Sequence, residues 1–243
     1  MSEDGIVIRK CSNLDEMAAC VALQKEIWNF TDADVVPLRM FVVAGNIGGQ
    51  VIAAIDEGEI VGFALSVPGA RGGHPYLHSQ MLGVRATHRN AGLGRRIKLF
   101  QREDALDRGF ELIEWTFDPL EIKNAYLNIE RLGAVARRYT VNQYGLTSSA
   151  LQGGLPSDRL VAEWWLKSKR VENMLQSVAK PAFETVKAIS VPGQIYAWRE
   201  TPATRDRARE LQEANRRHFL EAFSAGLTAV SYTHLTLPTN REV

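Results

Sequence analysis

The chain has 243 residues, of which 45% are hydrophobic and 23% are charged. These proportions are ordinary for a globular protein, so they exclude an intrinsically disordered chain and a coiled coil. The formal net charge of +1 at pH 7 excludes a whole-protein field that would gather nucleic acid or an anionic membrane, and any cationic site must therefore be local.

Strand and helix patterns alternate through the first part of the chain. Apolar periodicity, capping residues and glycine or proline turns set their limits. The predicted elements are, in order, a strand at 6–10, a helix from Ser12 or Asn13 to Ile27, a second helix near Pro37, strands at 50–55 and 60–67 that form a hairpin at Gly58, a Gly/Pro-rich connection at 68–75 and a strand at 77–84. They continue with a helix ending at Gly109, a strand at 111–117, a helix at 121–131 and a strand at 134–141.

The remainder of the chain reads as a second, smaller unit. It is predicted to contain a loop at 152–158, a strand at 159–166, a polar joint to Lys180, a strand near 185–191 and a helix at 201–225. We therefore expect a main domain at 1–148 and a C-terminal extension at 149–229.

Residues 230–243, with the sequence VSYTHLTLPTNREV, break the helical pattern that precedes them. The string VSYTHLTLPT resembles the translated read-through of a sequencing adapter. We therefore expect a non-native tail here, with the natural chain continuing past Ala229, and exclude the tail from fold reasoning.

The two cysteines, Cys11 and Cys20, lie nine residues apart in what reads as one helix. That spacing predicts no disulfide, and no partner ligands for a metal accompany them. The first residues are acidic where a secretory signal would be basic, and no apolar run reaches the length of a membrane span. We expect a cytoplasmic protein with reduced thiols and no metal.

The most informative segment is a basic glycine loop between the strand at 77–84 and the next helix. Gly92 and Gly94 allow backbone N–H groups to approach an anion, and the helix N-terminus adds its positive dipole end. Five cations fall within fourteen residues of the nearly neutral chain, namely Arg85, Arg89, Arg95, Arg96 and Lys98. The loop lacks the ending of a Walker loop, and Ile97 replaces the third glycine of a dinucleotide fingerprint. We therefore predict a pyrophosphate site of another kind.

The string RNAGLG resembles the R/Q-x-x-G-x-G/A pyrophosphate loop of the GNAT N-acetyltransferase superfamily, with Arg89, Gly92 and Gly94 matching. The preceding strand, the following helix, the strand EWTF and the helix ending in RLGA also stand in that family's order, so the resemblance covers about residues 5–145. HSQMLGV, WTFDPL, NAYLN, LGA, YG and GLPSDRL resemble a branch of the superfamily with an extra C-terminal unit.

The resemblance implies an α+β fold with a mixed, mostly antiparallel central sheet flanked by helices and a smaller C-terminal α/β extension. It implies acetyl-CoA or another acyl-CoA as co-substrate and the amine of a small molecule or amino acid as acceptor. The amine would attack the thioester directly in a ternary complex, without a metal or a covalent enzyme intermediate.

The resemblance also implies which residues hold the coenzyme. In the loop these are Arg89, Asn90, Ala91, Gly92, Leu93, Gly94 and Arg95. On the preceding strand, Met81, Leu82, Gly83 and Val84 would supply backbone N–H groups to the pantetheine arm and the thioester carbonyl. Their side chains also read as core. The family's coenzyme-contacting asparagine is replaced by Ile122, so Asn124 or Asn128 would take its place.

The family's usual acid, a tyrosine, is replaced by Ile129. Tyr126 is the candidate proton donor, with Tyr139 and Tyr144 as alternatives. His78 and Glu114 are candidate bases, His78 because an imidazole works near neutral pH.

Each further candidate also has a structural interpretation. His78 suits a structural role, and Glu114 suits the polar face of a strand. Asp118 suits a turn cap, and of the pair Trp164 and Trp165 we expect one in the core and one on the surface.

Two other functions compete with catalysis. The missing tyrosine suggests a non-catalytic CoA-binding or regulatory module. The basic loop suggests an RNA- or nucleotide-binding domain, which the near-neutral charge and the lack of interleaved aromatics disfavour. We expect a small-molecule amine or amino-acid partner, no nucleic acid and no membrane, and a homodimer is compatible with the sequence.

Overall fold

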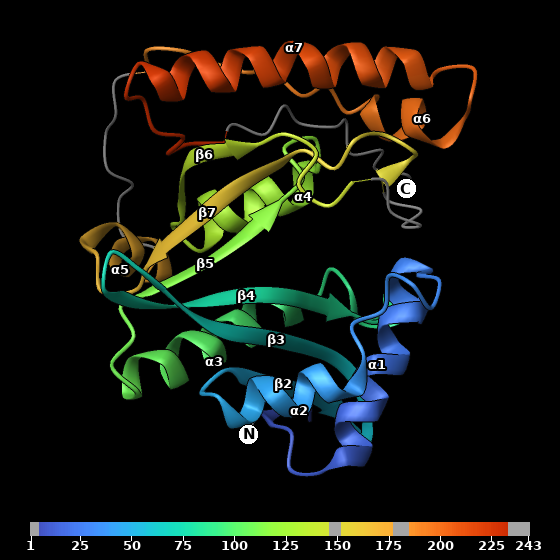
Figure 1. Cartoon of the computed structure of the whole chain (residues 1–243), viewed down its shortest axis with the longest axis vertical. Helices are drawn as coiled ribbons and strands as arrows, with labels where there is room; N and C mark the ends of the chain where they lie inside the picture. The colour runs from blue at the N-terminus through green and yellow to red at the C-terminus, as the bar shows by residue number, and fades with distance from the viewer. Residues whose placement is uncertain (1–4, 146–151, 177–184, 233–243) are drawn as a thin grey trace, which may run out of the picture. The chain divides into compact units, whose positions relative to one another are not determined.

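The computed structural model of the chain describes residues 5–145, 152–176 and 185–232 (Figure 1). These residues form two compact units, the first made of 5–115 and 163–168 and the second of the rest. The expected boundary between residues 148 and 149 lies outside the described residues, as does most of the expected tail, 233–243. Neither expectation is tested, and both stay predictions.

The first unit holds most of the strands. Its elements are β1 (Val7–Lys10), α1 (Leu14–Trp28), α2 (Leu38–Asn46), β2 (Gln50–Asp56), β3 (Glu59–Arg71), β4 (His74–Val84), the short 3₁₀ turn η1 (Ala86–His88), α3 (Leu93–Asp107) and most of β5 (Leu112–Phe117). The second unit contains α4 (Ile122–Ala125), the π-helical segment η2 (Tyr126–Arg131), β6 (Val135–Thr140), most of β7 (Arg159–Trp165), α5 (Lys169–Leu175), α6 (Ile195–Glu200) and α7 (Arg205–Ser224).

The seven strands form one mixed sheet in the order β1-β2-β3-β4-β5-β7-β6. The first three pairings are antiparallel, and β4 pairs with β5 in parallel. The predicted fold class, a mostly antiparallel central sheet flanked by helices, is confirmed.

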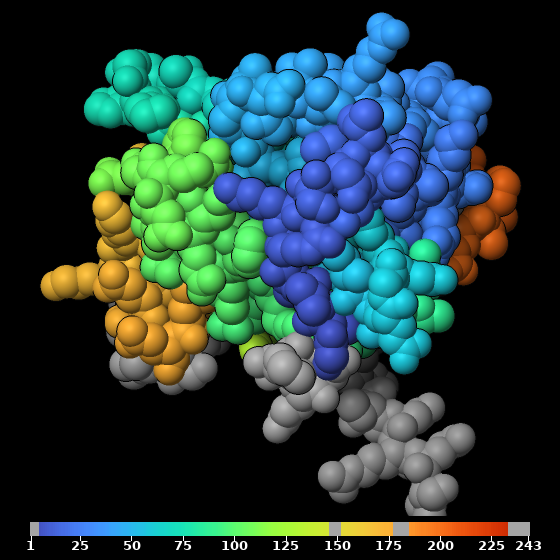
Figure 2. Space-filling model, turned by 90° about the horizontal axis from the view of Figure 1, so that it is seen from below, coloured from blue at the N-terminus to red at the C-terminus, as the bar shows by residue number. Residues whose placement is uncertain are grey.

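Alternating residues of β2 place the two layers of the first unit's core. Val51 and Ala53 pack with Phe41 of α2 and with α1, whereas Ile52 and Ala54 pack on the opposite face with α3. Period-2 alternation of this kind requires apolar side chains on both faces when helices cover both, which explains why β2 is almost continuously hydrophobic. Figure 2 looks onto a face where the blue N-terminal helices lie at the surface.

The stretch at 68–75 is a correction to the predicted elements. Instead of an irregular connection, it forms the far end of a long β3–β4 hairpin, which turns at Gly72 and Gly73 with φ of 57° and 80°. Two consecutive positive φ values are typical of a type I′ hairpin turn. Pro68 is tolerated within β3 because the pairing with β2 ends at Ser66, so its missing N–H interrupts no ladder there.

The C-terminal part contains two further corrections. Helix α5 lies in the predicted polar joint, the predicted strand near 185–191 has no regular structure, and helix α6 lies between that stretch and the expected helix α7. Local β-propensity makes a strand only where a ladder partner is available. The predicted helix at 121–131 becomes a short α-helix followed by a π-helical segment.

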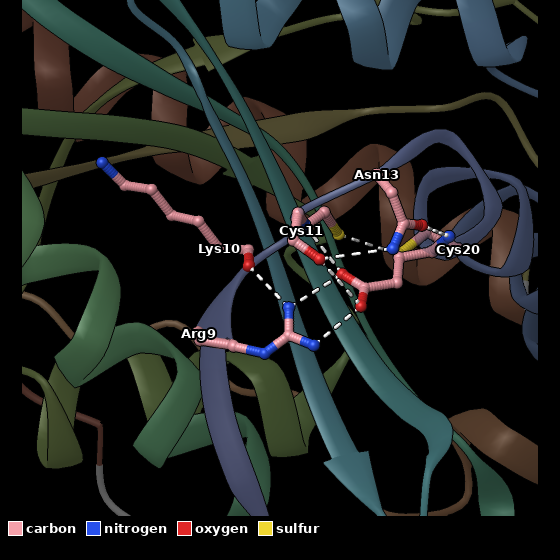
Figure 3. Close-up of polar contacts among 7 residues, drawn as sticks. Arg9, Lys10, Cys11, Asn13 and Cys20 are labelled. Atoms are coloured by element: carbon pink, nitrogen blue, oxygen red, sulfur yellow. Dashed lines mark hydrogen bonds and ion pairs between the residues drawn. The ribbon is translucent and has the colours of Figure 1, made fainter.

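The start of α1 shows how the first loop is fixed (Figure 3). Asn13 Oδ1 accepts the Glu16 backbone N–H at 2.9 Å, and Glu16 accepts the Ser12 N–H at 2.8 Å, which together form a capping box. Arg9 donates two hydrogen bonds of 2.8 and 2.7 Å to Glu16, and these hold the pKa of Glu16 at about 2. The cap therefore joins β1 to α1.

The two cysteines are another correction. Cys11 lies before α1 rather than in it, and its Sγ is 3.9 Å from Sγ of the buried Cys20 (Figure 3). The hydrogen bond with Cys20 lowers the pKa of Cys11, whereas the same hydrogen bond and burial raise that of Cys20. Spacing along one helix was the wrong basis for excluding a disulfide, because the chain turns between the two residues.

This proximity predicts that mild oxidation with diamide joins the two thiols within one chain. The product should lose two hydrogens by mass and both free thiols by titration, and the crosslink should stabilise the fold by about 2 to 3 kcal/mol. Cys11→Ser is the control and should block the reaction. Retention of both thiols in the oxidised wild-type protein would contradict the proximity.

Candidate functional site

The loop between β4 and α3 has the backbone form of an anion cradle. Asn90 and Gly92 have φ of 65° and 78°, and Gly92 is the N-cap of α3. Because this cap is a glycine, it has no side chain that could hydrogen-bond to the first turn of α3. The N-cap residue therefore leaves the first N–H groups of the helix to another acceptor, and an anion can take that place.

Space is available at both matching glycines. A Cβ at Gly92 would have no heavy atom within 4 Å, and one at Gly94 would meet only Val84 and Leu82 at 3.9 and 4.0 Å. Arg89 Nε donates to the Val84 carbonyl at 2.9 Å and so ties the loop to the end of β4. The glycine positions of the loop are therefore open, and the hydrogen bond from Arg89 attaches the loop to the end of β4.

The cations of this segment do not all face the loop, although the sequence suggested a single cluster. Arg85 pairs with Glu26 and Glu59 at 3.2 and 2.8 Å. Arg96 donates to the Ile6 carbonyl, and Lys98 is buried. Of the other two cations, Arg89 lies in the loop and Arg95 lies in the first turn of α3.

Strand β4 carries a bulge at its centre. Ser79 pairs with Ser66 and Met81 pairs with Leu65, so Gln80 is the extra residue. The β4–β5 ladder has two pairs, Leu77–Ile113 and His78–Glu114, and β4 continues for six residues beyond it. Among the described residues, one edge of residues 79–84 is thus outside the β5 ladder.

The side chains of residues 81–84 pack on both faces of the sheet. Met81 packs with the α1/α2 core, and Leu82 and Val84 pack with the α3 core, which agrees with the expectation that these side chains are also core residues. Gly83 has no room for a side chain. A Cβ there would lie 2.7 Å from Ile27 and 2.9 Å from Trp28.

The two candidate bases are neighbours in the β4–β5 ladder. His78 is half-buried, whereas Glu114 is 2% exposed. Arg71 donates to both oxygens of Glu114 at 2.6 and 2.8 Å and lies over the ring of Tyr76. A bidentate guanidinium favours the ionised carboxylate.

Sequence reasoning did not find Arg71, because it lies in the stretch that was interpreted as a connection. Its pKa is raised, first by the hydrogen bonds to Glu114 and also by the charge of Glu163. The signal available was the alternation of Arg71 with apolar residues at the end of β3.

The other sequence candidates lie in the second unit. Asn124 is exposed, Asn128 is buried and Tyr126 is 37% exposed. Tyr139 donates to Asp158 at 2.6 Å, and the Tyr144 hydroxyl is 2.9 Å from that of Thr116. Burial and the bond to Asp158 raise the pKa of Tyr139, which makes it a poorer proton donor. The roles of Asn124, Asn128 and Tyr126 stay predictions.

Two structural interpretations are supported by the structure. Asp118 Oδ1 accepts the Leu120 N–H at 2.8 Å, as a turn cap does, and Asp118 also pairs with Arg199. Trp164 is fully buried and Trp165 is 43% exposed, so one lies in the core and one on the surface.

Within residues 5–145, 152–176 and 185–232, no three or more His, Cys, Asp or Glu side chains are grouped to hold a metal ion. None of the helices in those ranges combines the length and hydropathy that a membrane crossing requires.

Part of the chain matches a known protein family. Residues 17–126 match the model described as the Acetyltransferase (GNAT) family. No curated protein sequence matches the chain.

The fold is similar to those of solved acetyltransferases. A putative acetyltransferase, yncA, from Salmonella typhimurium with acetyl-CoA has a TM-score of 0.54 and 17% identity, covering 67% of this chain and 95% of its own. The ribosomal-protein-alanine N-acetyltransferase from Brucella melitensis has 0.52 and 20%, covering 65% and 98%. Aminoglycoside 6'-acetyltransferase type Ii has 0.53 and 18%, covering 67% and 99%.

At these identities the structural likeness establishes the fold alone, and the family model supplies the assignment for residues 17–126. The glycine loop, the bulged β4 and the uncapped start of α3 all lie within that range. Residues 17–126 therefore match the GNAT acetyltransferase family, a family of acyl-CoA-dependent N-acyltransferases.

Proposed function

We propose that this protein transfers an acetyl or other acyl group from acyl-CoA to the amine of a small molecule or amino acid. The observation that carries the proposal is the glycine-capped start of α3, which follows β4 after the loop at 85–92, together with the end of β4 that lies outside the β5 ladder. An anion cradle and a row of backbone donors thus lie next to each other in the chain. We place this activity in the cytoplasm.

The loop fits the pyrophosphate of coenzyme A. Gly92 and Gly94 leave room for phosphate oxygens, and the first N–H groups of α3 can donate to them. Arg89 and Arg95 add positive charge beside this position. When bound, acyl-CoA supplies an activated thioester, and those N–H groups of residues 81–84 that point away from β3 can donate to its carbonyl oxygen.

His78 and Glu114 can take the proton that the attacking amine loses, because only a neutral amine is nucleophilic. Arg71 holds both oxygens of Glu114, which makes that carboxylate the weaker candidate. In this proposal His78 is the base and the Arg71–Glu114 pair fixes the neighbouring strand.

The fold itself does not select the acceptor. The similar structures include an enzyme named for a ribosomal-protein alanine and one named for an aminoglycoside. A small amine or amino acid is our choice of acceptor class, and a panel of amines assayed by thiol release from acetyl-CoA would test it.

Exchange of the candidate bases tests the mechanism. His78→Gln should lower kcat by about 10- to 100-fold with little change in the KM for acetyl-CoA, because a base acts only in the transition state. Glu114→Gln should have the smaller effect on kcat. His74→Gln, on the same strand and exposed, is the matched control and should leave both constants unchanged.

The same experiment separates two functions. If both His78→Gln and Glu114→Gln keep wild-type rates and pH profiles, neither residue is the base. If the wild-type protein binds CoA but releases no thiol with any amine, the regulatory CoA-binding module replaces the enzyme. This second function is motivated by Ile129, a buried residue at the position where the family has its tyrosine.

A further inference from the structure

Lys98 lies in the interior of the first unit, six residues after the glycine that caps α3. Its side chain is 2% exposed. Its Nζ donates to Ser79 Oγ at 2.8 Å and to Gln101 Oε1 at 3.0 Å, and lies 3.8 Å from the ring centroid of Trp115. Two oxygens and one aromatic face thus receive the three donors of the ammonium group.

The residues around Lys98 mark the end of the β4–β5 ladder. His78 and Glu114 form its last pair, Ser79 is the next residue on β4 and Trp115 is the next on β5. Lys98 therefore contacts both Ser79 and Trp115, the residues that follow the last ladder pair on β4 and on β5. It does so from the helix whose N-terminus carries the glycine loop.

The contacts of Lys98 continue into a buried polar network behind the bulge of β4. Gln101 Nε2 donates to Ser66 Oγ at 2.6 Å, and Ser66 Oγ donates to Gln50 Oε1 at 2.9 Å. Ser66 is the β3 residue that pairs with Ser79, immediately before the bulge. The network thus fixes both strands at the point where β4 changes its register.

No counter-ion accompanies this buried cation. The nearby carboxylates pair with other cations. On α3, Asp104 forms ion pairs with Lys10 and Arg108. On β5, Glu114 forms an ion pair with Arg71. Asp104 reaches the network only through its hydrogen bond from Gln50. Within the part of the chain that the structure describes, no carboxylate forms an ion pair with Lys98.

A buried ammonium group without a counter-ion destabilises a fold, and burial lowers the pKa of Lys98 to about 7. A methionine of similar length would fill the space without that cost. Stability therefore does not account for a lysine at this position, and its contacts at the end of the ladder do.

We propose that Lys98 is a positioning residue for acyl transfer, which fixes Ser79 of β4 and Trp115 of β5 beyond their last pair so that the N–H groups of residues 81–84 that point away from β3 are presented to the thioester. The inference rests on the proposed acyltransferase function. It adds a residue of α3 that acts through the two strands and touches neither the acyl group nor the amine.

Lys98→Met is the decisive variant, and Lys25→Met, an exposed lysine on α1, is its control. We expect Lys98→Met to keep its CoA affinity within about threefold, since the glycine loop is intact, and to lose about tenfold or more in kcat. The pH dependence of kcat near pH 7 should change in Lys98→Met and remain in Lys25→Met. A wild-type kcat and pH profile in Lys98→Met would overturn the proposal.

Hydrogen exchange gives a readout that does not depend on activity. Amides of residues 79–84 should exchange faster in Lys98→Met than in wild type, while those of β2 remain unchanged. Ser79→Ala, which keeps the lysine but removes one acceptor, should show the same change to a smaller degree and serves if Lys98→Met fails to fold. Unchanged exchange in both variants would overturn the proposal.

These outcomes separate the inference from the proposed function. If the wild-type protein releases no thiol from acetyl-CoA with any amine, the proposed function fails and with it the role in acyl transfer, whatever the exchange data show. If the wild-type protein is active and Lys98→Met equals it in rate, pH profile and exchange, the function stands and the role of Lys98 is wrong.

Discussion

Gly94→Glu is expected to weaken CoA binding by about 100-fold or more while leaving the protein folded. A carboxylate placed about 4 Å from a phosphate costs about 4 kcal/mol near a protein surface, and each 1.4 kcal/mol is a factor of ten in affinity. The backbone tolerates the change, because a Cβ at Gly94 would meet its nearest neighbour only at 3.9 Å. Glutamate in the first turn of a helix is also favourable.

Isothermal titration with CoA measures this effect. Gly45→Glu is the matched control, because Gly45 is an exposed glycine of α2 with open space around it and an ordinary φ. It introduces the same charge away from the loop and should bind CoA as the wild type does. Equal affinities for Gly94→Glu, in a folded state, and for wild type would remove the loop as the coenzyme site.

Lys98→Met should change how stability depends on pH. The folded-state pKa of Lys98 is about 7, below its ordinary value of 10.5, so the unfolded chain binds more protons between these two pH values. The wild-type free energy of unfolding therefore contains a penalty that is complete below pH 7 and disappears as the pH rises toward 10.5. The methionine variant lacks this penalty.

The difference in unfolding free energy between the variant and wild type should accordingly favour methionine most at pH 6. It should shrink by about 2 to 3 kcal/mol on going to pH 9, at a limiting slope of about 1.4 kcal/mol per pH unit. Denaturant unfolding at several pH values measures it, with Lys25→Met showing no such trend. A difference that does not vary with pH would mean that Lys98 is not a buried, titrating amine.

The backbone form of the loop was predictable because it depends on neighbouring residues. Arg89, Gly92 and Gly94 lie within six residues, and the need for a positive φ and an open helix N-terminus can be read from glycine spacing alone. The central strands were predictable for a similar reason, since apolar runs bounded by turn residues show where they begin and end.

What the sequence did not reveal depends on contacts between distant residues. Arg71 and Glu114 are 43 residues apart and meet only because the hairpin extends beyond the glycine-rich stretch. Lys98 was counted among the cations of the loop. A signal was nevertheless present, because Lys98, Gln101 and Ala105 recur at spacings of three and four on one buried face of α3.

The second unit was harder to predict because its elements are short. Helices α5 and α6 have seven and six residues, too few for periodicity to separate a helix from a loop. The run at 185–191 has strand-like composition but no strand structure, because a strand requires a partner that composition does not specify.

The lack of space for a side chain at Gly83 couples the evolution of β4 to that of α1, which is far from it in the sequence. Ile27 and Trp28 of α1 occupy the space that a Cβ at position 83 would need. In descendants of a common ancestor, a larger residue at 83 should therefore arise only together with smaller residues at 27 and 28. Co-variation among these three positions, across relatives that keep the glycine loop, would show that α1 and β4 have evolved together.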